Sequence, residues 1–419
     1  MIKLDKHINR SAKGVLECAI HDTRIIAIQG ARQTGKSTLA KELASADNDR
    51  YLTLDTASVR ESAKANPADF VRQSPDGMLV IDEIQRVPEL VLELKELVDA
   101  SSRPGQFLIT GSSDLAALTG VQESLAGRME RIELMPFSQQ ELRETNPSFF
   151  PDIFDPEYAP KTAHDVLTRK DYLELAMAGG YPEALLRSDK QRRDVWFDNY
   201  IRLLFEQEAN SNSQINADPL FQEKFFSYLA TIGGKELVVD SISNDMNIKR
   251  YGVEQLLARL QRLFLIKVMP AWSTNLTNRA IKQAKVFLKD SGIAARLLRA
   301  SPSTSSDLTS PIAGAIFETF VVNELLRMAN DGRAHYDFYH YRDMRKREVD
   351  IVIENEYGKV LLIEVKASST VAASDFSAIN YLLSKHPDRV ARGLVIYTGS
   401  VPLPFGEKLL ALPASCIWA

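Results

Sequence analysis

Short apolar runs alternate with amphipathic stretches along the first third of the chain. The runs at residues 24–29, 78–81 and 107–110 have the length and continuity of buried strands. A further strand is expected at residues 51–55. Strands that alternate with helical patterns predict an α/β domain built on a parallel sheet.

The rhythm changes near residue 171, where apolar residues recur at i, i+3, i+4 and i+7. This spacing predicts amphipathic helices over residues 171–186 and 194–208, with a break at Gly179 and Gly180. We expect these helices to form a lid or connector on the first domain.

A third pattern begins near residue 221. Helices are expected at residues 224–234, 238–246 and 251–263, followed by strands at 265–269 and 285–288. Three helices followed by two strands are typical of a winged helix-turn-helix.

Two irregular tracts divide the chain. Residues 146–160 are rich in proline, and residues 301–311 form a polar, serine-rich linker. We therefore predict three domains, at residues 1–150, 151–300 and 301–419.

Length and composition agree with several soluble domains. The 419 residues are 45% hydrophobic and 25% charged, which excludes wholesale disorder and collagen-like or disulfide-scaffold classes. No run approaches the roughly 18 apolar residues of a membrane span, and residues 1–14 lack the apolar core of a secretion signal. Cys18 and Cys416 have no metal-ligand spacing. We expect a cytoplasmic protein without a membrane partner.

A phosphate-binding motif follows the first strand. The sequence GARQTGKS fits G-x-x-x-x-G-K-S, with a strand before it and a helical pattern after it. Such a loop turns its N–H groups and the helix N-terminus toward phosphate oxygens, its lysine toward the β- and γ-phosphates, and its serine toward Mg²⁺. The predicted nucleotide-binding residues are Gly30, Ala31, Arg32, Gln33, Thr34, Gly35, Lys36, Ser37 and Thr38.

Two carboxylates end the run at residues 78–81. Asp82 is predicted to hold Mg²⁺ with Ser37, and Glu83 to orient or deprotonate the attacking water. The next strand ends near Thr110 and Ser112, either of which is a candidate for sensing the γ-phosphate. Together these residues predict an ATPase that requires Mg²⁺.

Residues 20–140 resemble the AAA-type ATPases, and the DEIQ segment resembles the clade that includes origin-recognition and signalling ATPases. The resemblance implies a parallel sheet with one strand between the P-loop strand and its usual neighbour. It also implies that hydrolysis often needs an arginine from a neighbouring subunit. Residues 125–131 supply two candidates, Arg128 and Arg131, of which Arg128 is the better, and Arg86 is a weaker third. A homo-oligomer is the corresponding partner expectation.

Charge is unevenly distributed. The net charge of −4 is the sum of a basic middle segment and two acidic flanking segments. The middle segment, residues 218–300, has 13 Lys/Arg against 7 Asp/Glu. A basic winged helix is a candidate for DNA binding through phosphate contacts, although a protein-docking domain with solvated charges fits the same pattern. The basic residues near the third helix and the wing are Lys249, Arg250, Arg259, Arg262, Arg279, Lys282 and Lys285.

The C-terminal part carries a second set of acidic residues. Glu318 lies in a predicted helix, Asp350 in a strand 32 residues later, and Glu364-x-Lys366 in a second strand that would form a hairpin with the first. Asp350 and Glu364, with Glu318, are candidates for holding Mg²⁺, and Lys366 for positioning a water.

This order of residues resembles the PD-(D/E)XK nuclease superfamily. The segments GAIFETFVVNEL, YRDMRKREVDIVIE and VLLIEVKAS also resemble a C-terminal domain of unknown function found after AAA-type domains in bacterial and archaeal ATP-binding proteins. The resemblance implies an α/β, restriction-endonuclease-like domain. Such folds also serve as passive DNA grips, so cleavage and binding both stay open.

Two functions follow from these patterns. The first is a Mg²⁺-dependent ATPase that couples ATP to a DNA-directed, nuclease-like effector domain. The alternative is an ATP-operated switch or scaffold whose nuclease-like fold only binds DNA or a protein partner.

Overall fold

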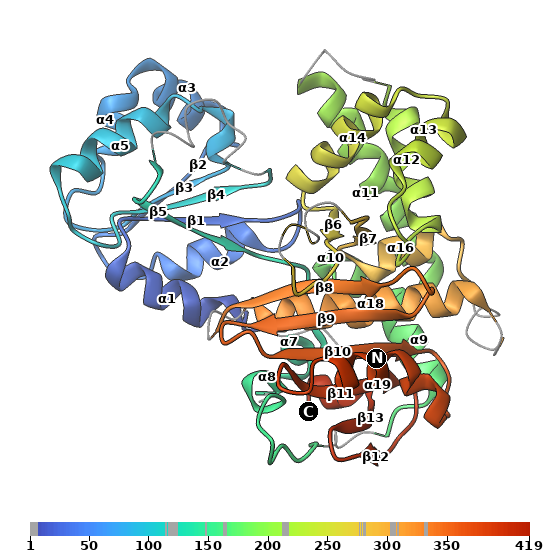
Figure 1. The fold of residues 1–419 in the computed structure, drawn as a ribbon. Helices are drawn as coiled ribbons and strands as arrows, with labels where there is room; N and C mark the ends of the chain where they lie inside the picture. Colours follow the sequence, from blue (N-terminus) through green and yellow to red (C-terminus); the bar gives the residue numbers. More distant parts are fainter. Residues whose placement is uncertain are drawn as a thin grey trace.

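The chain has the three-part α/β architecture of Figure 1 in a computed structural model. The described residues are 7–113, 115, 125–146, 149–161, 166–211, 218–275, 277, 279, 282–301, 307, 310–330 and 334–419.

A five-stranded, fully parallel sheet forms the N-terminal part. Its strand order is β2-β3-β4-β1-β5, so that β4 lies between β1 and β3, as the AAA-type resemblance implied. The strands are β1 (Ile25–Gln29), β2 (Arg50–Thr53), β3 (Leu79–Asp82), β4 (Phe107–Gly111) and β5 (Met129–Glu133).

Helices cover both faces of this sheet. Along β1, Ile26 and Ile28 pack with Leu16 and Leu39, while Ile25 and Ala27 belong to a separate core that includes residues of α5. A strand buried on both faces must be apolar throughout, which explains the continuous run. The helices are α1 (Ala12–Asp22), α2 (Lys36–Leu43), α3 (Ala57–Ala65), α4 (Pro67–Val71) and α5 (Leu90–Ala100).

The middle part follows the predicted order of helices and strands. Its two strands pair antiparallel, and its core includes Phe225, Leu229 and Leu257. The winged-helix assignment itself stays a prediction. The elements are α10 (Pro182–Leu185), α11 (Lys190–Ser211), α12 (Pro219–Thr231), α13 (Val239–Met246), α14 (Arg250–Arg262), β6 (Ile266–Met269), β7 (Lys285–Leu288) and α16 (Ser291–Leu297).

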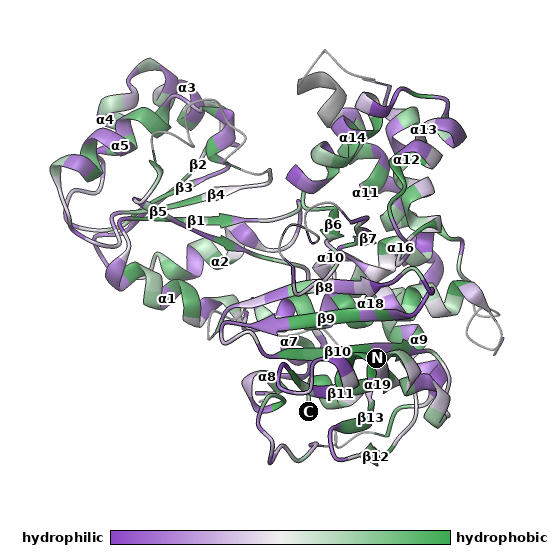
Figure 2. Cartoon of the chain, viewed as in Figure 1, coloured by the Kyte–Doolittle hydropathy of each residue, from purple (hydrophilic) through white to green (hydrophobic). Residues whose placement is uncertain are grey.

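A mixed six-stranded sheet forms the C-terminal part, in the order β12-β13-β11-β10-β9-β8. Strands β9 and β10 form the predicted antiparallel hairpin, and both carry long hydrophobic stretches (Figure 2). The elements are α18 (Pro311–Ala329), β8 (Tyr336–Arg342), β9 (Glu348–Asn355), β10 (Val360–Lys366), α19 (Ser377–Lys385), β11 (Val390–Tyr397), β12 (Leu403–Gly406) and β13 (Leu409–Pro413).

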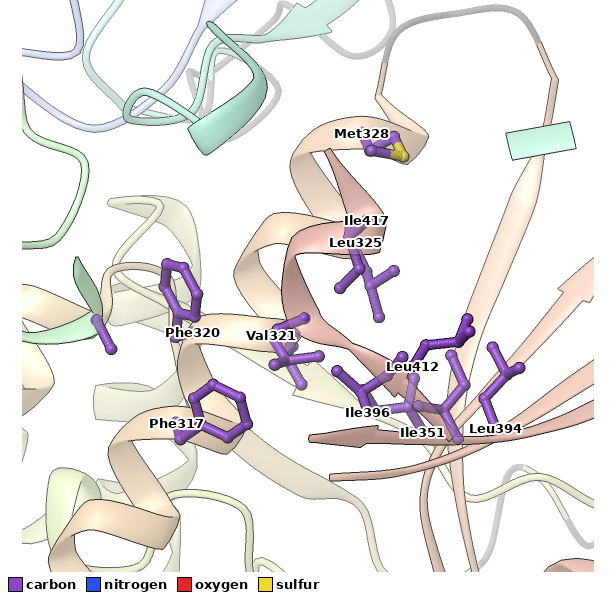
Figure 3. Packing of buried hydrophobic residues seen from close by; sticks show 14 of the residues in the cluster. Phe317, Phe320, Val321, Leu325, Met328, Ile351, Leu394, Ile396, Leu412 and Ile417 are labelled. Carbon is purple, nitrogen blue, oxygen red and sulfur yellow. The ribbon is translucent and has the colours of Figure 1, made fainter. Parts of the chain in front are cut away.

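Helix α18 packs its apolar residues onto this sheet. Phe317, Val321 and Leu325 lie in one cluster with Ile351 and Ile396 of the strands (Figure 3). The large buried area of these side chains is the main stabilising contribution to this part of the fold.

The C-terminal core also takes in residues that precede the middle part. Phe149 and Phe150 of α8 (Phe149–Asp152) and Tyr172 of α9 (Arg169–Ala178) belong to the same cluster as Trp418. The Tyr172 hydroxyl donates to Ser415 Oγ at 2.8 Å. Helix α9 was expected in a connector on the N-terminal domain, but its apolar face is buried against the C-terminal sheet domain instead.

A buried ionic junction connects the three parts. Arg327 of α18 contacts Glu324 at 2.7 Å and Asp290 at 3.4 Å. Glu324 accepts the backbone N–H of Gln139 at 2.7 Å, and Asp290 accepts that of Gly180 at 2.8 Å. Burial raises the pKa of Asp290 and of Glu324, and Arg327 opposes the shift.

The outer strand of the C-terminal sheet is covered by the middle part. His340 on β8 forms a parallel bridge with Ala271, and its N–H donates to the Pro270 carbonyl at 3.0 Å. The buried His340 ring bonds through Nε2 to the Gln283 carbonyl at 3.0 Å. Burial lowers the pKa of His340 to about 4.

This histidine predicts a pH dependence of stability. In the unfolded state His340 takes up a proton below about pH 6.5, whereas in the folded state it stays neutral down to about pH 4. Protonation therefore favours the unfolded state, and the free energy of unfolding falls as the pH falls from about 6.5 to about 4. Between pH 7.5 and pH 5 we expect a loss of about 2 kcal/mol in wild type that is missing in His340→Gln. Urea unfolding at each pH measures it. His335→Gln, at an exposed site, should follow wild type, and parallel curves for wild type and His340→Gln would refute the assignment.

Candidate functional site

The predicted P-loop residues form one loop between β1 and α2. Gly30 has φ +148°, and a Cβ there would lie 2.3 Å from the Leu134 carbonyl oxygen. Gly35 and Gln33 also have positive φ, and α2 begins at Lys36. The two glycines therefore shape a loop that other residues would not permit.

Lys36 is bound to the loop itself. Its Nζ donates to the carbonyls of Gly30 at 3.0 Å and Ala31 at 2.8 Å. Burial lowers the pKa of Lys36 to about 8, although Glu83 and Asp82 raise it in part. A buried ammonium with only neutral carbonyl partners is a site prepared for anionic ligands such as phosphate.

Asp82 receives four hydroxyl groups at the end of β3. Ser37 Oγ and Thr110 Oγ1 donate to Oδ1 at 2.8 and 2.7 Å, while the Tyr51 hydroxyl and Thr53 Oγ1 donate to Oδ2 at 2.9 and 3.0 Å. Burial and Asp82 together raise the pKa of Tyr51. A carboxylate and a hydroxyl in contact are hard oxygen ligands, so this pair fits Mg²⁺.

Glu83 lies beside the predicted sensor residues. Ser112 Oγ donates to Glu83 Oε2 at 3.0 Å, and the Gln85 amide donates to both Ser112 Oγ and Glu83. The N–H of Glu83 donates to Thr110 Oγ1 at 2.9 Å. Thr110 therefore connects the Asp82 carboxylate with the backbone of Glu83, and Ser112 contacts the Glu83 side chain.

Two long-range contacts to the loop were not predicted. Arg10 NH1 donates to the Thr34 carbonyl at 2.6 Å and its Nε to Glu141 at 3.0 Å. The Tyr200 hydroxyl of α11 donates to the Arg32 carbonyl at 3.2 Å. No motif in the sequence marks either residue, because both belong to segments far from residues 30–38.

An apolar pocket adjoins the P-loop. It has a volume of about 220 Å³ and lies against Gly35 and Thr38, with Ile8, Leu39 and Phe137 among its apolar walls. A concave apolar surface beside a phosphate loop suits a nucleobase.

Arg128 lies at the opposite end of the sheet from the P-loop. Its carbonyl accepts the N–H of Ile25, the first residue of β1, and its guanidinium pairs with Asp99 at 2.5 Å. It therefore does not reach the nucleotide site of its own chain. A role at the site of a neighbouring subunit stays a prediction.

The structure brings the C-terminal acidic residues together around a lysine of the middle part. Lys285 Nζ lies 3.4 Å from Glu318 Oε1, 3.4 Å from Asp350 Oδ1 and 2.7 Å from Glu348 Oε1. Glu364 lies on β10 next to this group, and it pairs with Lys366 Nζ at 3.5 Å. Glu348 precedes Asp350 by two residues on β9, so the alternation of a strand places both side chains on one face. No pattern in the sequence around Lys285 indicates that this lysine joins them.

The pKa values of these groups reflect the missing solvent and the mutual repulsion of the acids. Burial and then Asp350 raise the pKa of both Glu318 and Glu364. Burial lowers the pKa of Lys285, but Glu318, Asp350 and Glu348 outweigh it and raise the net value.

These residues do not fit a divalent cation as they are arranged. Within the part of the chain that is described, no three His, Cys, Asp or Glu side chains are placed to hold a metal. An ammonium already lies among the carboxylates, and Asp350 Oδ2 also accepts the Val365 N–H at 2.9 Å. A second cation at this place would be repelled by Lys285.

Two basic residues of the wing are paired with acids of the C-terminal part, which corrects the expectation that they contribute to a DNA-binding surface. Arg279 pairs with Glu354 at 2.8 Å, and Lys285 is buried among carboxylates. Lys282 lies over the Tyr341 ring and is exposed. Lys249, which precedes α14, and Arg262, its last residue, are exposed, and Arg250 pairs with Asp240 and Glu254.

Three family models match separate parts of the chain. Residues 22–143 match an AAA domain, residues 169–304 a domain of unknown function (DUF8612), and residues 313–417 a domain of unknown function (DUF4143). The N-terminal part is thus an AAA-type P-loop domain. Within the described residues, no helix is both long and apolar enough to cross a bilayer.

Similar proteins cover nearly the whole chain. Uncharacterized proteins of Mycobacterium bovis and Mycobacterium tuberculosis are each 25% identical over 411 residues, which is 97% of this chain and 84% of theirs. A Walker-type ATPase of Pyrococcus abyssi matches 71% of this chain and 97% of its own, with 14% identity and a TM-score of 0.45.

Proposed function

We propose that the protein binds and hydrolyses ATP with Mg²⁺ at the loop between β1 and α2. The observation that carries the proposal is the contact between Ser37 and Asp82 at 2.8 Å, beside a buried Lys36 that has only carbonyl partners. These are the hydroxyl, carboxylate and ammonium that phosphoryl transfer from a nucleotide requires.

Each residue has a distinct role in this proposal. When ATP binds, Lys36 would leave the loop carbonyls for the β- and γ-phosphates, and Ser37 and Asp82 would hold Mg²⁺. The bound ion supplies charge neutralisation on the phosphate oxygens. Glu83 accepts the proton of the attacking water or orients it, and Ser112 holds the carboxylate of Glu83 in position.

Nucleotide binding would be transmitted through the loop carbonyls. Arg10 and Tyr200 hold the carbonyls of Thr34 and Arg32, so any movement of the loop acts on the N-terminal segment and on α11. Tyr200 also contacts the Tyr181 hydroxyl at 3.2 Å, next to the Gly180 of the ionic junction. This is a physical connection between the nucleotide and the other two parts of the chain.

Nucleotide binding tests the proposal. Because charge-assisted hydrogen bonds contribute about 1.5–3 kcal/mol, Lys36→Ala should weaken ATP binding by about 10- to 100-fold. Titration calorimetry measures it with Mg²⁺ and again with EDTA. Lys64→Ala, at an exposed site on α3, is the control. Equal affinity of Lys36→Ala and wild type would refute the site.

For the C-terminal part we favour the switch or scaffold over the nuclease. The support is Lys285, which lies where metal-dependent cleavage would need a divalent cation. Under this proposal the ATP state changes how the middle and C-terminal parts present themselves to a partner. The proposal also includes a homo-oligomer in which Arg128 completes the P-loop site of a second copy of the chain.

DNA is the proposed partner of the exposed end of α14. Lys249 precedes the helix and is exposed, so it is free to reach phosphates. If it does, Lys249→Ala should weaken binding equally for all sequences and lower the slope of log affinity against log salt by about 1. Fluorescence anisotropy with duplex DNA measures both. Lys170→Ala on α9 is the control, and an unchanged slope in Lys249→Ala would remove α14 as the contact.

A further inference from the structure

Lys285 is almost completely buried at the boundary between the middle and C-terminal parts. It is the first residue of β7, and its side chain is 1% exposed. Its ammonium lies within 3.4 Å of three carboxylates of the C-terminal part: Glu318 on α18, and Glu348 and Asp350 on β9. A lysine loses considerable solvation on burial, so this group is retained only because the carboxylates surround it.

The backbone of the middle part closes the same cluster. A Cβ on Gly234 would lie 2.6 Å from Glu318 Oε2, so the chain passes directly over this carboxylate. The backbone N–H of Gly234 donates to the Val286 carbonyl at 3.0 Å, and the backbone of Glu236 forms an antiparallel β-bridge with that of Lys285. The carboxylates are therefore covered by the segment that carries the lysine.

Further contacts hold this segment in place. Arg342 of β8 lies 3.3 Å from Glu236 and 3.5 Å from Glu348, and so connects the two sides of the cluster. Arg279 pairs with Glu354 at 2.8 Å, where both side chains are 13% exposed. Lys285 is consequently positioned by the fold and is not a flexible lysine that happens to reach an acid.

We propose that Lys285 takes the place of a divalent cation in the nuclease-like site, so that Glu318, Asp350 and Glu348 form an interdomain latch and not a metal centre. The positive charge that stabilises the acids is supplied by the chain itself. The latch fixes the middle part on the C-terminal sheet and covers the carboxylates. The proposal does not depend on ATP hydrolysis at the P-loop.

Binding of Mn²⁺, a paramagnetic substitute for Mg²⁺, tests the latch. Electron paramagnetic resonance of the full chain without nucleotide counts the bound ions. We expect wild type and Asp350→Asn to bind the same number of Mn²⁺ ions, because the latch of wild type holds no ion. In Lys285→Met, which keeps the length of the side chain but not its charge, we expect one additional bound ion that is lost in the double variant Lys285→Met/Asp350→Asn.

The controls separate charge from packing. Lys285→Arg keeps the positive charge and should bind no additional ion, whereas Lys366→Met at the half-exposed neighbour should behave as wild type. A wild-type Mn²⁺ site that Asp350→Asn abolishes would overturn the proposal. So would a folded Lys285→Met protein that binds no additional ion.

If Lys285→Met does not fold, a measurement on the wild-type protein decides the question. Reductive methylation followed by peptide mass spectrometry compares the reactivity of individual lysines. Lys285 should be protected by at least about tenfold relative to exposed Lys249, and the protection should disappear in urea. Equal labelling of the two lysines in the folded protein would show that the ammonium is not held by the cluster. These readouts are independent of ATPase activity, so failure of the latch and failure of the proposed ATPase are distinguishable.

Discussion

Replacing Glu83 by glutamine is expected to lower the rate of ATP hydrolysis by about 10²- to 10⁴-fold, the range typical of a lost general base. Glutamine keeps the size of the side chain and its contact with Ser112, but it does not accept a proton from water. Glu83 is hydrogen-bonded to Ser112 and Gln85, whereas Lys36 bonds to loop carbonyls and Ser37 to Asp82, so ATP should still bind. Steady-state phosphate release and equilibrium nucleotide binding, measured on the same preparation, give the two values.

The separation of binding from turnover is what this prediction tests. Glu89→Gln, at an exposed position directly before α5, should retain wild-type activity. A Glu83→Gln protein that hydrolyses ATP at the wild-type rate would remove Glu83 from the reaction. Loss of ATP binding together with hydrolysis would instead assign Glu83 a structural role.

Removing Arg327 is expected to destabilise the folded chain by about 3–5 kcal/mol, since two buried carboxylates would lose their shared cation. The side chains of Arg327, Glu324 and Asp290 are 5%, 2% and 1% exposed. Both acids also fix backbone N–H groups of other parts of the chain, so their displacement would loosen Gln139 and Gly180. Urea unfolding of Arg327→Ala followed by circular dichroism measures the shift.

An exposed ion pair provides the comparison for Arg327→Ala. Lys170 and Glu174 lie 3.8 Å apart on α9 with side chains 70% and 57% exposed, so Lys170→Ala should change stability by less than about 0.5 kcal/mol. A similarly small effect of Arg327→Ala would mean that the junction contributes little to holding the three parts together.

The local signals in the sequence located the loop between β1 and α2 and the acids at the end of β3. The motif that begins at Gly30 follows a strand and runs into a helix at Lys36 as predicted, and the Ser37 hydroxyl donates to Asp82, 45 residues further along the chain. Parallel strands present their carboxyl ends at one edge, so a motif at the end of β1 and acids at the end of β3 must converge. The strand order then brought in Tyr51 and Thr53, which carry no motif.

The positive charges of the middle part show where sequence alone misleads. A count of basic residues groups Arg279, Lys282 and Lys285 with Lys249 as one DNA-binding surface. In the folded chain Arg279 pairs with Glu354 and Lys285 is buried among acids of the C-terminal sheet domain, whereas Lys282 stays exposed beside Tyr341. Composition reports the number of charges, but only packing determines which of them solvent or a ligand can reach.

By itself, the sequence determined what depends on neighbours along the chain. This includes the phosphate loop, the alternation of strands and helices, and the hairpin that places Asp350 beside β10. The tertiary structure alone decided what depends on residues far apart in sequence: the contacts of Arg10 and Tyr200 with the loop, the junction at Arg327, and the burial of Lys285. The physical reason is that a motif requires a local backbone geometry, whereas the cost of burying a charge depends on which distant groups the fold brings to it.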